Sequence, residues 1–505
     1  MKLKSVPFSL ALSCVGGLLP TIGQAQSANQ PTNVVIMIAD DISSNDLGCY
    51  GHPVVKTPNI DQLAKNGVRF TNAFLTTSSC SPSRSSIITG RYPHNTGACE
   101  LHSPLPENQV VFPKLLKEKG YYTAQAGKWH FGASPVEPTG VAKDGFDRTG
   151  GSSKDGGGYS GAEKWIDYLK ERPKDQPFFM WFASHDAHRK WDEDIFLPSY
   201  QPDEVIVPPY MVDNMETRKD LVAYYNEVSR FDYFVGQVVK ELEAQNILDN
   251  TLLIVMADNG RPFPRDKTRL YDSGIKTPFV IHCPDLIPNP GVVSKSLLSA
   301  IDIAPTILEI AGGQKSETFQ GESFADLLKN PQEPFRKYVF AEHNWHDFRS
   351  YERMVRTENY LYIENAFPKQ NMVGAQDVMT GGAGRALQKG YEAGTLNDIQ
   401  KGIYKIPQAE RELYNCKNDS LQLNNVVHEQ KYQKELKNLR RVLHKWQAAT
   451  HDSKPQTLTK DWYSRTDGEP LPEKGIRGQM PGVDKNASAI IKDKGEQAVY
   501  MEVNE

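Results

Sequence analysis

The 505-residue sequence is short of several features that define other classes of protein. After residue 25 it has no apolar run near the roughly 20 residues that span a bilayer, so no transmembrane span is expected. Its net charge of −4 leaves no basic surface for nucleic acid, and a polyanionic partner would need a local basic cluster. No internal repeat is present, and the six cysteines lack zinc-site spacing.

What the sequence does have is the composition of a globular enzyme, with 39% hydrophobic and 24% charged residues. Its length predicts two domains, which we place at 26–325 and 326–505, where the composition changes. Residues 1–25 have the basic start, apolar stretch and small final residues of a signal peptide, which predicts export to a bacterial periplasm or the medium. Cys14 as a lipoprotein anchor fits less well, because the preceding residues match that pattern poorly. Export permits one or two disulfides, with the pairing left open.

Short apolar runs alternate with helical patterns up to about residue 310, and strands buried on both faces are typical of a parallel sheet. The predicted strands are 33–39, 121–126, 177–184, 252–257 and 278–282, and the predicted helices are 58–66, 112–119, 162–172, 219–245 and 301–308. A second region follows from about residue 326. Its predicted elements are strands of a smaller antiparallel sheet at 338–341, 354–356 and 360–363, a helix over 429–447 and an irregular tail after about 452.

Oxygen ligands follow two of the predicted strands. Asp40 and Asp41 come after strand 33–39, and Asp258 and Asn259 come after strand 252–257. Open α/β sheets place their sites at the carboxyl ends of strands. Paired carboxylates repel each other unless a cation or hydrogen bonds offset the charge, and hard oxygen ligands suit Ca²⁺ or Mg²⁺. Taken alone, each of these two residue pairs also fits an ordinary turn.

Basic residues follow two further strands. Lys128 and His130 come after strand 121–126, and both would point to one face if that strand continued. His185 and His188 come after strand 177–184, in the run His-Asp-Ala-His-Arg. If no other motif were present, a surface position for Lys128 and a core position for His130 would be the preferred interpretation.

The stretch 72–97 organises the rest, and its centre is Cys80-Ser81-Pro82-Ser83-Arg84, followed by Thr89-Gly90-Arg91. Pro82 fixes the turn, and residues 83–88 can start a helix capped by Ser79 or Ser81. Cys80 would then lie at a helix N-terminus, where backbone amides favour an anion, with Arg84 one turn further on. A buried structural cysteine is the alternative for C-x-P-x-R in isolation.

Together these motifs resemble type I sulfatases, a family within the alkaline-phosphatase-like superfamily. The resemblance runs from residue 32 to about 450, with the motif blocks in family order. It includes Gly-Lys-Trp-His-x-Gly at 127–132 and Lys-x3-Tyr-x2-Gly-x3-Pro from Lys267 to Pro278. It implies an α/β fold with a large mixed, mostly parallel sheet sandwiched by helices, and a smaller C-terminal α+β domain with an antiparallel sheet.

The resemblance also implies the chemistry. In this family the cysteine becomes formylglycine (3-oxoalanine), made by a formylglycine-generating or an anaerobic sulfatase-maturing enzyme, and its hydrated aldehyde attacks sulfur beside one divalent cation, usually Ca²⁺. The implied catalytic residues are Cys80, Arg84, Lys128, His130, His188 and Lys267. The implied cation ligands are Asp40, Asp41, Cys80, Asp258 and Asn259. Residues near the substrate that also fit structural roles are His102, His185, Arg261, His343 and His346.

Within the family the chain looks most like the sulfamidase (heparan N-sulfatase) branch, with one departure. Sulfamidases carry arginine where this chain has Lys267, and a lysine can give a compact charge or a proton to an alkoxide leaving group. We therefore expect hydrolysis of O-sulfate esters on sugars of a sulfated polysaccharide or its oligosaccharides, such as ulvan or carrageenan. The alternatives are N-sulfoglucosamine hydrolysis on heparan-type glycans, phosphodiester or phosphonate monoester hydrolysis, and glycan binding without turnover.

Overall fold

The structure is a computed structural model that describes residues 1, 31–132, 138–152, 159–191 and 200–472. The predicted signal peptide, Cys14 within it and the end of the irregular tail lie outside the described residues. Among the helices of the described residues, none combines the length and the apolar character needed to cross a bilayer. The five cysteines of the described residues are all free.

In the described residues the larger sheet has eight strands and a mostly parallel topology. In their order across the sheet they are β4 (Arg148–Gly150), β3 (Tyr122–Gly127), β5 (Phe178–Ala183), β1 (Asn33–Ala39), β6 (Thr251–Ala257), β7 (Phe279–His282), β2 (Val68–Phe74) and β8 (Val292–Ser299). Strand β7 runs antiparallel to both of its neighbours, and the other pairs are parallel. The expected mixed sheet is therefore confirmed.

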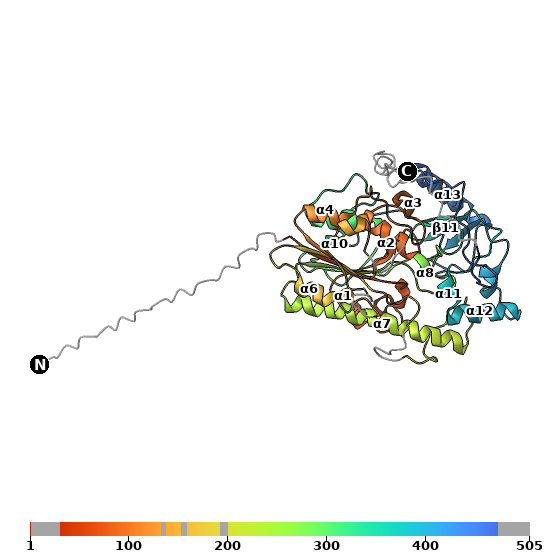
Figure 1. Cartoon of the computed structure of the whole chain (residues 1–505), viewed down its shortest axis with the longest axis horizontal. Coiled ribbons are helices and arrows are strands. Elements are labelled where there is room, and N and C mark those ends of the chain that lie inside the picture. The colour runs from red at the N-terminus through yellow and green to blue at the C-terminus, as the bar shows by residue number, and fades with distance from the viewer. Residues whose placement is uncertain (2–30, 133–137, 153–158, 192–199, 473–505) are drawn as a thin grey trace. The chain divides into compact units, whose positions relative to one another are not determined.

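Helices cover both faces of this sheet (Figure 1). One side carries α1 (Pro58–Lys65), α6 (Trp165–Glu171) and α7 (Met215–Ala244), and the other carries α2 (Cys80–Thr89), α4 (Phe112–Glu118), α9 (Ile303–Ile310) and α10 (Ala325–Lys329). Strand β1 shows why two layers are needed, because successive side chains point to opposite faces. Ile36 packs in the core on the α2 side and Val35 in the core on the α7 side, and both are fully buried.

The smaller sheet is antiparallel throughout, as expected. Its strands, in order, are β12 (Arg411–Asn415), β11 (Tyr360–Asn365), β10 (Glu352–Arg356) and β9 (Val339–His343). Helix α13 (Gln433–Ala449) packs on one face, where the ring of Trp446 stacks on Phe340 with centroids 5.0 Å apart. The other face packs against residues of β2 and β8, and the backbone N–H of Glu342 donates to the carbonyl of Thr76 at 2.9 Å. Whether the chain divides into domains at residue 325 stays a prediction.

Shorter helices complete the described part of the chain. They are α3 (Pro93–Thr96), α5 (Val141–Asp144), α8 (Asp272–Ile275), α11 (Gln376–Met379) and α12 (Gly382–Glu392), with 3-10 turns at Ser44–Asp46, Gly48–Tyr50, Ala300–Asp302, Gln400–Tyr404 and Gln430–Tyr432. Strand β8 and helices α11 and α12 were not predicted. Both helices matter below, because they border the cavity above the site.

Candidate active site

Four neighbouring parallel strands deliver most of the predicted site residues from their carboxyl ends: β3, β5, β1 and β6. Ala39 of β1 pairs with Ala257 of β6, so the residues that follow them, Asp40 and Asp258, lie side by side. Gly127 of β3 pairs with Ala183 of β5 in the same way, just before Lys128. The site is therefore a direct product of strand register.

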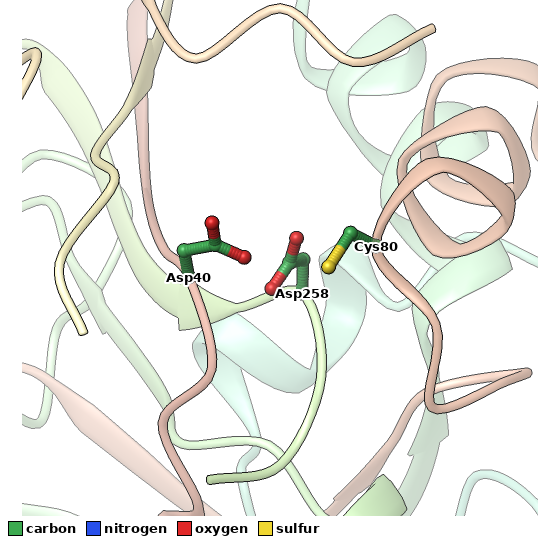
Figure 2. A group of neighbouring side chains, drawn as sticks. All are labelled: Asp40, Cys80 and Asp258. Carbon is green, nitrogen blue, oxygen red and sulfur yellow. The ribbon is translucent and has the colours of Figure 1, made fainter. Parts of the chain in front are cut away.

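Cys80 reaches this edge as the first residue of α2. Its Sγ lies 3.9 Å from Oδ1 of Asp41, and one ligand atom from each of Asp40, Cys80 and Asp258 falls within 4.8 Å of the others. Figure 2 shows these three side chains pointing toward one another. Ser79 precedes the helix but makes no capping bond; its hydroxyl instead pairs with Nδ1 of His346 at 2.7 Å.

Three cations offset the buried carboxylates. Arg84, one turn into α2, donates from Nε to Oδ2 of Asp258 at 2.8 Å. Lys128 pairs with Oδ2 of Asp40, and Lys267 donates to Oδ2 of Asp41 at 2.8 Å. Strand β3 ends before Lys128, so the strand alternation expected for Lys128 and His130 is wrong, although both side chains still lie in the site.

Compensation is incomplete at two of the three carboxylates, whereas Lys128 and the other neighbouring cations outweigh burial and hold the pKa of Asp40 well below its ordinary value. Burial raises the pKa of Asp41 to about 6 against the opposing charge of Lys267, and raises the pKa of Asp258 to about 7 against that of Arg84. Within the described residues, Oδ1 of Asp40 and Oδ1 of Asn259 are buried without a hydrogen-bond partner. Buried oxygens of this kind almost always have a partner. Buried hard oxygen donors that lack hydrogen-bond partners fit a divalent cation, so the residues suit the ion that the sequence resemblance implies.

The two predicted catalytic histidines differ in exposure: His130 is buried at the bottom of the site, and His188 lies at its opening to solvent. His130 is buried, and its Nε2 lies 2.9 Å from Nδ1 of His102. Burial and the charge of Lys128 hold the pKa of His130 well below its ordinary value. The side chain of His188 is 33% exposed, and burial together with the charge of Lys267 lowers its pKa to about 4. Both rings are therefore neutral near pH 7 in the free protein.

A cavity of about 1180 Å³ opens above Cys80. It extends from His130, His188 and Lys267 along α7 to the start of α12. Pockets for small molecules usually measure about 300–1,000 Å³, so this one has room for more than one sugar ring. The wall includes Trp191 and Lys219, an aromatic face and a cation.

The predicted substrate residues are not all brought to this cavity. His102 and His346 line it. Arg261 does not: its guanidinium is held by Asp46 at 2.9 Å and Asp266 at 2.7 Å, in contacts that belong to the packing of the loop. His343 pairs with Glu352 at 2.9 Å, away from the cavity, and Cδ2 of His185 packs so close to Gly161 that a Cβ there would lie 2.9 Å from it.

Sequence reasoning missed Asp377 in α11. Its Oδ2 accepts a hydrogen bond from Lys267 at 2.8 Å and lies 3.7 Å from Nε2 of His188. The Asp347 carboxylate accepts from the backbone N–H of Gln376 at 2.9 Å and fixes the start of that helix. No motif marks these residues, although Asp347 lies next to the singled-out His346.

Several residues around the site have a left-handed backbone, which costs a non-glycine residue about 1–3 kcal/mol. They are Asp41 at φ 62°, His102 at 63°, His130 at 51°, Thr268 at 70° and Asp347 at 62°. Such conformations cluster at functional sites, where the surrounding structure holds them. The backbone thus points to the same location as the side chains.

The chain is similar to known proteins in sequence and in fold. A family model described as Sulfatase matches residues 32–313, and one described as the C-terminal part of N-sulphoglucosamine sulphohydrolase matches residues 263–373. The chain belongs to the sulfatase family. It is a sulfuric ester hydrolase with a sulfamidase-like C-terminal region and an alkaline-phosphatase-like fold.

Individual relatives of this sulfatase act on different sugars. Human N-sulphoglucosamine sulphohydrolase is 30% identical over 465 residues, which cover 84% of this chain and 91% of that protein. An ulvan-active sulfatase of Formosa agariphila is 27% identical over 474 residues, covering 83% and 75%. A solved structure in complex with its substrate D-glucosamine-2-N,6-O-disulfate aligns with a TM-score of 0.62 at 22% identity, covering 83% of this chain and 98% of that one.

Proposed function

We propose that this sulfatase hydrolyses O-sulfate esters on sugars of a sulfated polysaccharide or its oligosaccharides, with algal polysaccharides such as ulvan or carrageenan as candidates. The observation that carries the proposal is the convergence of Cys80, His130, His188 and Lys267 on one cavity of about 1180 Å³. A cavity of this size suits a substrate longer than a single sulfated sugar. The ulvan-active relative supports the algal assignment.

Cys80 is the proposed nucleophile position, and it would act as formylglycine. Burial raises the pKa of the Cys80 thiol well above its ordinary value, so an unmodified thiol would stay protonated and react poorly. When formed, the formylglycine supplies a hydrated aldehyde hydroxyl for attack on sulfur. Arg84 and Lys128 would offset negative charge around this position, since both already pair with buried carboxylates there.

The proposed proton transfers use two histidines on different sides of Cys80. His188 lies at the exposed mouth beside Lys267, where it can give a proton to the leaving oxygen of the sugar. The sulfate's negative charge raises the pKa of an adjacent imidazole, which offsets the low value of His188 in the free protein. His130, whose Nδ1 has no partner among the described residues, can accept a proton at the floor of the site.

We assign the cation as one Ca²⁺, with Mg²⁺ the weaker alternative, held by Asp40, Asp41, position 80, Asp258 and Asn259. Ca²⁺ accepts crowded oxygen ligands, whereas Mg²⁺ usually keeps several waters. The ion would polarise a sulfate oxygen. We also propose export to a bacterial periplasm or the medium, based on the N-terminal sequence pattern, and maturation by a formylglycine-generating or anaerobic sulfatase-maturing enzyme.

N-sulfoglucosamine is the second candidate substrate, because the human relative and the C-terminal family model both carry that name. Lys267 favours the O-sulfate, since an alkoxide is a strongly basic leaving group and a lysine ammonium can donate to it. To separate the two candidate activities, sulfate release from N-sulfoglucosamine is compared with release from ring O-sulfates on one enzyme preparation. Parallel assays with a phosphodiester and a phosphonate monoester test those alternatives.

The Cys80→Ala variant tests the proposal directly. We expect at least a 10⁴-fold loss of sulfate release, because the nucleophile position is lost. Cys416→Ala is the matched control, a half-buried free cysteine elsewhere, and it should keep full activity. Intact-peptide mass should show loss of sulfur at position 80 in the wild type. Undiminished turnover by Cys80→Ala, or an unmodified thiol in active enzyme, would exclude the scheme.

A further inference from the structure

Asp377 is a charged group of the cavity that the proposed chemistry does not use, although it contacts Lys267 and lies beside His188. It lies in α11, in the C-terminal part of the chain, and its side chain is 25% exposed to the cavity. Its Oδ2 accepts a hydrogen bond from Lys267 at 2.8 Å and lies 3.7 Å from Nε2 of His188. The two groups proposed to act on the leaving oxygen therefore share one carboxylate.

Within the described residues, only one oxygen of that carboxylate is engaged. Each hydrogen bond and ion pair between the Asp377 carboxylate and the described residues uses Oδ2. Oδ1 is therefore available to a molecule in the cavity. The carboxylate is also held in place, because Asp347 accepts from the backbone N–H of Gln376 and Lys267 holds the side chain. An acceptor fixed in this way loses little entropy when a substrate binds.

A carboxylate is a poor neighbour for a sulfate group, since like charges repel. Its value must come from another part of the substrate. Cys80 marks the position of the sulfur, and Lys267 and His188 mark the bridging oxygen, so Asp377 lies on the sugar side of the scissile bond. Substituents on neighbouring ring carbons lie within hydrogen-bonding distance of one another. A group beside the bridging oxygen therefore also reaches the substituent on the next carbon.

We infer that Asp377 determines specificity: its free oxygen accepts a hydrogen bond from a hydroxyl or ammonium group on the ring carbon next to the sulfate ester, and its charge disfavours a second sulfate there. This inference rests on the proposed hydrolysis of sugar sulfates. It goes further by specifying which substituent the sugar carries next to the sulfate ester. A site that hydrogen-bonds a substrate group discriminates against analogues that lack it. Because this charged acceptor is partly exposed, we expect it to favour the hydroxyl-bearing substrate over the analogue without the hydroxyl by about 10–100-fold in kcat/KM.

The test compares enzyme variants with matched substrates. The 2-, 3-, 4- and 6-sulfates of methyl glucoside and methyl galactoside are screened with the full-length mature enzyme, and 4-nitrophenyl sulfate serves as a substrate without a neighbouring donor. The preferred sugar sulfate is then compared with its analogue in which the neighbouring hydroxyl is replaced by hydrogen, and with its neighbouring disulfate. The variants are Asp377→Ala, which removes the acceptor, and Asp377→Asn, which keeps an acceptor without the charge.

We expect Asp377→Ala to lower the ratio of kcat/KM on the preferred sugar sulfate to kcat/KM on its deoxy analogue by about 10–100-fold, whereas a loss that acts through Lys267 is common to both substrates and to 4-nitrophenyl sulfate and leaves this ratio unchanged. Asp377→Asn should retain most of the hydroxyl preference and gain about tenfold on the disulfate, where repulsion is relieved. Asp398→Asn, an exposed change in the same region, is the control, and melting temperatures check folding.

Three results would overturn the inference. Equal losses by Asp377→Ala on the hydroxyl and deoxy substrates would mean that Asp377 acts only through Lys267. No loss on either would mean that it does not contact the sugar. A clear preference for a 6-sulfate, which has no donor on the adjacent carbon, would also contradict it. A wild-type enzyme that releases no sulfate from any sugar would instead refute the proposed function, and this inference with it.

Discussion

Two clusters of buried charge lie in this protein. The active-site cluster, at the carboxyl edge of the large sheet, consists of Asp40, Asp41, Arg84, Lys128, Asp258 and Lys267. The structural cluster, at the small sheet, consists of His94, Glu342, Arg353 and Asp452. Both are almost fully buried, and both mix carboxylates with cations. They differ in how completely the polar atoms are satisfied.

In the structural cluster the charged groups are matched by hydrogen bonds. Arg353 donates to both oxygens of Asp452, at 2.6 and 2.8 Å, and Nδ1 of His94 pairs with Glu342 at 3.0 Å. Burial alone would raise the pKa of Asp452, but the charges of Arg353 and His94 and the hydrogen bonds from Arg353 and Gln447 together outweigh it and lower the value to about 2. In the active-site cluster, by contrast, Asp41 and Asp258 have raised pKa values, and Oδ1 of Asp40 has no hydrogen-bond partner in the described chain, with Nη2 of Arg84 3.8 Å away. Complete pairing fits a structural role, and incomplete pairing fits a site completed by a ligand.

Of the changes that compare the two clusters, the loss of a carboxylate from the active-site cluster should have the largest effect. Asp258→Asn should lower kcat/KM for sulfate release at least 10³-fold, because a bound cation supplies several kcal/mol of charge stabilisation. Calcium at 100 times its Kd should stabilise the wild type by about 2.7 kcal/mol, and this shift should be absent from the variant. Thermal unfolding of the wild type and the variant, each with EDTA and with CaCl₂, measures this stabilisation by calcium.

Asp285→Asn, an exposed change outside the site, is the control for that experiment and should keep both activity and the calcium shift. A calcium shift in Asp258→Asn as large as that of the wild type would place the ion elsewhere.

The matching change in the complete cluster should act on stability instead. Arg353→Met leaves Glu342 and Asp452 buried without their cation, which should lower the free energy of unfolding by about 3–5 kcal/mol. The calcium shift and the kcat of the folded fraction should persist. Urea unfolding measures the loss, with Arg441→Met on the exposed face of α13 as the control. A stable Arg353→Met protein that has lost its calcium response would reverse the assignment of the two clusters.

The two clusters also differ in how far the sequence could predict them. Asp40, Lys128, His188 and Asp258 each follow a strand whose apolar run is easy to recognise, and parallel strands bring such positions to one edge. The structural cluster gives no such signal, because His94 and Glu342 lie 248 residues apart in the chain and meet through the packing of α3 against β9. Local patterns carry no information about that contact.

The same reasoning explains the site residues that were misjudged or missed. Arg261 follows Asp258-Asn259-Gly260 closely, which suggested substrate contact, but its partners Asp46 and Asp266 hold it in the loop. Asp377 lies in a short helix without apolar periodicity, and it reaches Lys267 across 110 positions of sequence. Only tertiary structure shows that this part of the chain closes the cavity.

The smallest predicted effect is the loss of stability of the structural cluster at acid pH. The pKa of Asp452 is about 2 in the folded protein, below the ordinary value of 3.8. A lowered carboxyl pKa contributes stability that is present above the unfolded value and is lost as the pH falls toward the folded value. The wild-type advantage over Asp452→Asn should therefore shrink by about 2 kcal/mol between pH 5 and pH 2, since one pKa unit is about 1.4 kcal/mol. Urea unfolding of both proteins across this range measures the difference, and Asp285→Asn corrects for the general effect of acid. A difference that stays constant with pH would mean that Arg353 does not hold Asp452 ionised, and that the structural cluster gains nothing from its charge.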